Sequence, residues 1–272
     1  MIPWALAALL AAGAAETQGS GVRIGDLPWT QAEQILTAER IVVLPLGAGS
    51  KEHGPHLTLR NDEILADYLA DRVLKERPVA MLPTLTYAYY PAFLEYPGSV
   101  SLAADTQRDV VVQICRSIAR YGPRRFYVLN TGISTVPPLK ASLELLAREG
   151  VLLRYTDLHV AGQAAEARVR QQEAGTHADE IETSMLLYIR PDTVRMDRAV
   201  KDGLPYKPGP FVREPKEGAH YSASGVYGDA TLASIEKGRA VVEGLVADLL
   251  GELDALRAAA VPPGSPRSPL VP

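Results

Sequence analysis

Residues 41–48 read IVVLPLGA, a continuous apolar run rich in β-branched residues. Such runs are typical of strands that are buried on both faces of a parallel sheet. The segment 61–77, NDEILADYLADRVLKER, follows with apolar residues at helical spacing. Runs of both kinds alternate along the rest of the chain, with further strands expected at 79–85, 126–130 and 151–158 and helices at 104–121, 137–149, 160–173, 178–189 and 230–258. This alternation predicts an α/β fold whose parallel sheet is covered by helices on both faces.

The composition is that of an ordinary globular protein. The chain has 272 residues, of which 47% are hydrophobic and 22% charged, so a wholly disordered or collagen-like chain is excluded. The formal net charge is −4 and no basic block occurs, so we expect no nucleic-acid partner. Cys115 is the only cysteine, which excludes an internal disulfide and a cysteine-based zinc site. Any metal or acid–base chemistry therefore depends on five histidines and on carboxylates.

The two ends of the chain differ from its body. Residues 1–14, MIPWALAALLAAGA, form an apolar run that ends in an A-x-A pattern, which predicts a signal peptide and export to the periplasm or the extracellular space. The run lacks Lys and Arg, so a mis-assigned start is the alternative. It is shorter than the ~20 residues of a membrane span, and we expect no span in the mature chain. Residues 261–272 are rich in Pro and Ser and predict a disordered tail. One domain is expected between the ends, at about 20–260.

The loop after the first strand holds a cluster of metal-ligand side chains. Glu52, His53, His56 and Asp62 lie within eleven residues, at a strand end where α/β folds place their sites. Imidazole and carboxylate ligands suit zinc or manganese, and such an ion activates a water molecule and polarises a carbonyl group. The alternative is a polar loop in which Asp62 caps the next helix. A phosphate-binding loop is disfavoured, because GAGSK lacks the required spacing.

Four motifs, in the right order, resemble the creatininase (creatinine amidohydrolase) family. They are PLGAGSKEHGPHLTLRND at 45–62, YPGSVSL at 96–102, HADEIETS at 177–184, and SGVYGD at 224–229 followed by EKG at 236–238. The resemblance implies a three-layer α/β/α sandwich with a mostly parallel sheet. It also implies an amidohydrolase in which a metal-activated water attacks a non-peptide or cyclic C–N (amide) bond of a small molecule. Members are commonly homo-oligomers, often hexamers, so we expect a homo-oligomer here.

The same resemblance implies a set of metal ligands. His53 and Asp62 match family ligands in identity and in separation, and Asp62 corresponds to the carboxylate that bridges two metals. Glu182 is counted with them as a carboxylate near the site. Glu52 is a further candidate, although it is displaced by one position, because Lys51 stands where the family has its ligand glutamate.

After the strand at 126–130 the chain departs from the family pattern. Gly132 and Ser134 stand where the family has a ligand histidine and, in creatininase itself, a ligand glutamate. Neither residue replaces an imidazole or a carboxylate as a strong ligand. We therefore expect one zinc or manganese ion rather than two. The departure also keeps a second class of function open, a non-catalytic binding protein or pseudoenzyme that has lost its metal centre.

The remaining candidates concern catalysis and substrate. His177 and Glu180 are predicted to carry the proton to the leaving nitrogen, a general-acid role, although an acid at a helix start can also simply offset the helix dipole. Ser134, Tyr96 and His56 are predicted to bind the substrate. Their alternatives are a helix cap, packing in the core, and orientation of the loop.

Overall fold

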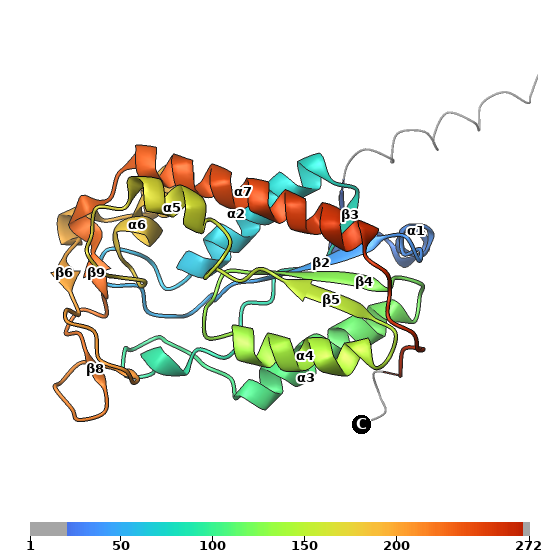
Figure 1. Cartoon of the computed structure of the whole chain (residues 1–272), viewed down its shortest axis with the longest axis horizontal. Helices are drawn as coiled ribbons and strands as arrows, with labels where there is room; N and C mark the ends of the chain where they lie inside the picture. The colour runs from blue at the N-terminus through green and yellow to red at the C-terminus, as the bar shows by residue number, and fades with distance from the viewer. Residues whose placement is uncertain (1–20, 269–272) are drawn as a thin grey trace, which may run out of the picture.

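Five parallel strands form the central sheet in the computed structural model, which describes residues 21–268. Its order is β1-β3-β2-β4-β5 (Figure 1). The strands are β1 (Val22–Arg23), β2 (Ile41–Leu46), β3 (Val79–Met81), β4 (Arg125–Asn130) and β5 (Leu152–Tyr155). The central strand β2 pairs in parallel with β3 and with β4, and all six of its residues are buried. The predicted signal peptide lies outside the described residues.

Helices cover both faces of this sheet (Figure 1). One face carries α3 (Ala104–Ala119) and α4 (Val136–Ala147), and the other carries α2 (Asn61–Glu76), α5 (Gln163–Val169), α6 (Glu180–Ile189) and α7 (Ile235–Ala258). Successive side chains of a strand point to opposite faces. Accordingly Ile41 and Val43 belong to the core under α2, α6 and α7, and Val42 and Leu44 to the core under α3 and α4. The three-layer α/β fold is therefore confirmed.

Several short elements complete the chain. The helix α1 (Trp29–Ile35) precedes β2. Two small sheets lie at the end of the molecule toward which the central strands run (Figure 1). They pair β6 (Lys201–Asp202) with β9 (Gly228–Asp229), and β7 (Phe211–Val212) with β8 (His220–Tyr221). Within the described part of the chain, no helix combines the length and the apolar character needed to cross a bilayer.

The main differences from the predicted boundaries have local causes. The second strand ends at Met81 rather than at Leu85, because Pro83 has no N–H for a ladder hydrogen bond. Beyond the proline, Leu85 N–H still donates to the Pro45 carbonyl at 2.8 Å. The helix α6 begins at Glu180 rather than at 178, because Asp179 is its N-cap and accepts hydrogen bonds from the backbone N–H groups of residues 181 and 182.

Candidate active site

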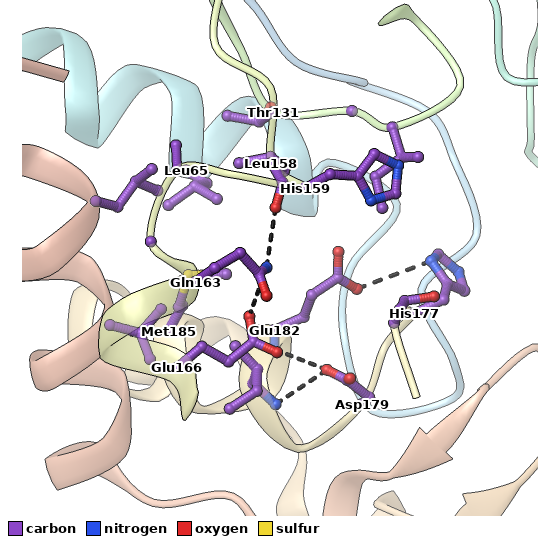
Figure 2. Close-up of a pocket in the computed structure, with 18 of the residues that line it drawn as sticks. Leu65, Thr131, Leu158, His159, Gln163, Glu166, His177, Asp179, Glu182 and Met185 are labelled. Atoms are coloured by element: carbon purple, nitrogen blue, oxygen red, sulfur yellow. Dashed lines mark hydrogen bonds and ion pairs between the residues drawn. The ribbon is translucent and has the colours of Figure 1, made fainter. Parts of the chain in front are cut away.

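A cavity of about 450 Å³ lies beyond the carboxyl ends of the central strands. Lys51 follows β2, Thr131 follows β4 and Leu158 follows β5, and all three line this cavity. The helix α6 closes another side with Glu182, as Figure 2 shows. The cavity therefore occupies the position at which parallel α/β sheets bind their ligands.

The loop between β2 and α2 fixes the ring of His53 between two acceptors. His53 Nδ1 lies 2.9 Å from the carbonyl oxygen of Lys51, and His53 Nε2 lies 2.8 Å from Asp62 Oδ1. A carbonyl oxygen can only accept, so Nδ1 carries a proton and donates it. In a neutral ring Nε2 then presents a lone pair to the Asp62 carboxylate. The 2.8 Å contact is an ordinary hydrogen bond if Nε2 also carries a proton, and otherwise the two atoms need a cation beside them.

The chemistry of the neighbouring donors fits a metal ion. His53, His177 and Glu182 each offer a ligand atom, and these atoms lie within 4.8 Å of one another. Both histidines are buried and Glu182 is partly buried. Two imidazoles and a carboxylate form a ligand set that suits a divalent zinc or manganese ion. The structure thus adds His177 to the predicted ligands His53 and Glu182.

Glu52 approaches the site through His177. Its Oε2 lies 2.9 Å from His177 Nε2, and Glu182 Oε2 lies 3.8 Å from Nδ1 of the same ring. Burial of the ring disfavours its charged form, but the two carboxylates outweigh this effect and raise the pKa of His177 above its ordinary value. Burial likewise opposes ionisation of Glu52, and the interaction with His177 still lowers the pKa of Glu52. Both shifts favour the ion pair between Glu52 and His177.

The start of α6 aims His177 and Glu182 into the cavity. Ala178 between them has a φ of +49°, a left-handed conformation that is strained for a residue with a Cβ. Its N–H donates to Glu182 Oε2 at 2.5 Å. Asp179 caps the helix, and burial together with the charge of Glu182 raises the pKa of Asp179 to about 6. This strained turn brings two potential ligands from one short segment to the same ion position.

Lys51 is buried beside the metal-ligand cluster. Its Nζ lies 2.7 Å from Asp62 Oδ2, and 7% of its side chain is exposed. The ammonium also lies 5.4 Å from the ring centre of Tyr90 and 5.2 Å from that of Phe93. Burial alone would raise the pKa of Asp62, but Lys51 and His53 outweigh it and hold that pKa well below its ordinary value. Asp62 therefore stays ionised.

Two other predicted site residues, Ser134 and Glu180, lie in different places relative to the cavity. Ser134 lines the cavity. The carboxylate of Glu180 instead accepts hydrogen bonds from the backbone N–H groups of Gln171 and Gln172 and forms an ion pair with Lys237, on the side of α7. It is not brought to the cavity wall, in contrast to His177.

Tyr96 and His56 are also held outside the cavity wall. Tyr96 donates its hydroxyl proton to the carbonyl oxygen of Ser222 at 2.7 Å. His56 Nε2 is hydrogen-bonded to Thr183 Oγ1 at 2.7 Å, and burial lowers the pKa of His56 to about 4. Both residues connect the loops that surround the site.

Sequence reasoning missed several residues of the cavity. The sequence singled out Lys51 only because it stands where the family has a ligand glutamate. No motif indicates that its side chain is buried. Phe93 and Phe211 face His177, with ring centres 4.1 and 5.8 Å from the imidazole. His159 also lines the cavity (Figure 2), and its place directly after the fourth predicted strand is a signal that could have found it.

Comparisons with known proteins agree with this geometry. The family model described as "Creatininase: Creatinine amidohydrolase" matches residues 25–253. The chain belongs to the creatininase family. A creatinine amidohydrolase of Pseudomonas putida is 28% identical over 255 residues, which are 87% of this chain and 96% of the relative. A mycofactocin precursor peptide peptidase of Mycobacterium tuberculosis is 27% identical, over 83% of this chain and 89% of the relative.

A solved structure shares the architecture. A mutant creatininase described as "Zn-Zn type" superposes with a TM-score of 0.71 at 25% identity, covering 88% of this chain and 99% of that one. The predicted family, the predicted fold and the assignment to the hydrolases are thus confirmed.

Proposed function

We propose that this creatininase-family chain is a metal-dependent hydrolase that cleaves a non-peptide or cyclic amide bond of a small molecule, with one zinc or manganese ion as its cofactor. The observation that carries the proposal is the cluster of His53, His177 and Glu182, whose ligand atoms lie within 4.8 Å of one another. Two relatives are named an amidohydrolase and a peptidase, and one structural neighbour is described as a zinc form, which supports both the reaction class and the metal.

The residues of the cavity would have different roles in the reaction. His53, His177 and Glu182 would hold the ion, with Asp62 beside it, and the ion would supply Lewis acidity and lower the pKa of a water molecule. Glu52 holds His177 Nε2 at 2.9 Å, so Nδ1, which lies 3.8 Å from Glu182, is the atom that would face the ion. The proton between His177 Nε2 and Glu52 is the one that would pass to the leaving nitrogen. We assign this proton to His177 rather than to Glu180, whose carboxylate is paired with Lys237.

The substrate side of the cavity favours a small and partly apolar molecule. Phe93, Met185 and Phe211 contribute apolar side chains to the cavity wall, and Ser134 contributes a hydroxyl group. A cavity of about 450 Å³ lies at the lower end of the range for small-molecule sites. We therefore propose a compact amide as the substrate.

The proposal is tested with a panel of small cyclic and linear amides. The natural chain is treated with a chelator and reloaded with zinc or manganese, and product formation is followed by mass spectrometry. We expect hydrolysis of at least one compound only after reloading, with loss of that activity in His53→Ala. Hydrolysis that is unchanged after chelation would overturn the metal dependence.

The pairing of the site carboxylates favours a second candidate, a non-catalytic binding protein. Lys51 neutralises Asp62, and His177 pairs with Glu52, so both acids have partners without a metal. A chain of this kind would bind a small molecule in the cavity and release it unchanged. It is distinguished by calorimetry against the same amide panel, since binding without turnover or metal uptake would favour it.

We also propose that residues 1–14 direct export and that the chain forms a homo-oligomer, of which a hexamer is one form. The A-x-A pattern supports the first proposal and the family membership supports the second. The mass of the mature chain in the exported fraction tests cleavage, and light scattering of the purified protein tests assembly. A full-length chain retained in the cell, or a monomer, would contradict these proposals.

A further inference from the structure

We propose that the ammonium of Lys51 occupies one of the two cation positions of a dinuclear centre and takes the place of a second metal ion in this chain. The inference rests on the proposed metal-dependent function. It adds to that function a second cation at the site, the ammonium group of a lysine that belongs to the chain. A structural neighbour, a mutant creatininase, is described as "Zn-Zn type", and a pair of cations is the arrangement with which this chain is compared.

Asp62 provides the first argument, because its two oxygens face two different partners, the candidate metal ligand His53 and the ammonium of Lys51. Oδ1 lies 2.8 Å from His53 Nε2, and Oδ2 lies 2.7 Å from Lys51 Nζ. In two-metal sites a shared carboxylate uses its two oxygens on two ions in this way. Here one of the two positions already contains a charged nitrogen that is fixed to the chain.

The surroundings of the ammonium suit an organic cation and not a metal ion. The rings of Tyr90 and Phe93 lie 5.4 and 5.2 Å from Lys51 Nζ. Aromatic faces attract an ammonium group through their quadrupole but offer no strong ligand to zinc. Metal-ligand side chains are instead gathered on the other side of Asp62, at His53, which supports a single metal position.

The chain has also closed the space at Gly132. A Cβ at this position would lie 3.1 Å from Thr135 Oγ1 and 3.2 Å from Tyr90 Cε1, which is tighter than ordinary contact. Tyr90 is buried, and its ring centre lies 5.4 Å from Lys51 Nζ. A ligand side chain at 132 would displace Thr135 and this ring. The ring that accompanies the ammonium therefore also limits the space for a ligand at 132.

The test is the zinc stoichiometry of the natural chain and of Lys51→Glu, measured by elemental mass spectrometry after dialysis against zinc. Lys140→Glu is the matched control, because it makes the same charge change at an exposed lysine of α4. We expect one equivalent in the natural chain and in the control. Lys51→Glu exchanges the ammonium for a ligand and is expected to bind one additional equivalent.

The outcomes separate this inference from the proposed function. One equivalent in all three proteins, or two in the natural chain, would overturn the role of Lys51 and leave the metal-dependent function intact. No zinc in the natural chain but one equivalent in Lys51→Glu would support the role of Lys51 and overturn the metal-dependent function. No zinc in any of the three would overturn both.

A second measurement applies if Lys51→Glu does not fold, as judged by circular dichroism. Crystals of the natural chain soaked in zinc are expected to show anomalous density on the Oδ1 side of Asp62 alone. Density on the Oδ2 side, with the Lys51 side chain displaced, would overturn the inference.

Discussion

Replacing Asp179 by asparagine changes how the stability of the chain depends on pH. Asp179 is buried at the N-cap of α6, the helix that carries Glu182. Burial and the neighbouring charge of Glu182 raise the pKa of Asp179 from 3.8 to about 6. An asparagine accepts the same backbone hydrogen bonds as a cap but does not titrate. The substitution therefore removes the proton equilibrium and keeps the helix start.

The sign and the size of the effect follow from the two pKa values. The folded state holds the Asp179 proton more tightly than the unfolded state does, so this stabilisation is complete below pH 3.8 and is lost as the pH rises through 6. The full difference corresponds to about 3 kcal/mol at 1.36 kcal/mol per pH unit. About 2 kcal/mol of it falls between pH 4.5 and pH 7.

Urea unfolding of the chelator-treated chain, followed by circular dichroism, measures this difference. The free energy of unfolding of the natural chain minus that of Asp179→Asn is expected to fall by about 2 kcal/mol from pH 4.5 to pH 7. Asp197→Asn, at an exposed position, is the control and is expected to show no comparable trend. A difference that stays constant or grows with pH would refute the reasoning about burial.

Three further predictions concern the support of the site. Glu182→Gln removes a charged ligand, and calorimetry is expected to show at least about a tenfold weaker binding of zinc; unchanged affinity would exclude Glu182 as a ligand. Gly225→Ala places a methyl group against the Glu52 carboxylate at a φ of +86°, so both stability and zinc affinity are expected to fall. Gly251→Ala, with open space in α7, is its control and should raise the free energy of unfolding by about 1 kcal/mol. Leu186→Ala opens a cavity under α6 and should cost about 2–5 kcal/mol in urea unfolding; a loss below 1 kcal/mol would contradict the packing.

The regular part of the fold was predictable from the sequence. The run at Ile41–Leu46 is uniformly apolar because both faces of β2 are covered, and the helix at Asn61–Glu76 is long enough for its periodicity to be clear. The paired strands β6, β7, β8 and β9 have two residues each, which is too short for any alternation. Their positions depend on contacts between distant segments, so no local pattern indicates them.

The candidate site was predictable in its loop but not in its contacts. His53 and Asp62 lie together because a strand end and the start of the next helix fix both. His177 and Glu180 were predicted to act together, but the Glu180 carboxylate pairs with Lys237 on the side of α7. The carboxylates that meet His177 are those of Glu52 at 2.9 Å and Glu182 at 3.8 Å, and only the folded loop and turn bring them together.

Lys51 shows the limit of sequence reasoning most clearly. A lysine in a polar loop is ordinarily exposed, and nothing in its neighbours along the chain indicates burial. Its burial depends on Asp62, Tyr90 and Phe93, which come from three different segments. The family pattern shows that Lys51 stands in place of a ligand, but only the folded structure shows that Asp62 is the partner of the lysine's charge.

X-ray absorption at the zinc edge, recorded on the zinc-loaded natural chain, tests the central claim most directly. We expect only nitrogen and oxygen ligands at about 2.0–2.2 Å, with the outer-shell scattering of two imidazoles from His53 and His177. His177→Gln should reduce this signal to that of one imidazole. A zinc spectrum without imidazole scattering, or a chain that retains no zinc, would contradict a metal centre at this cluster.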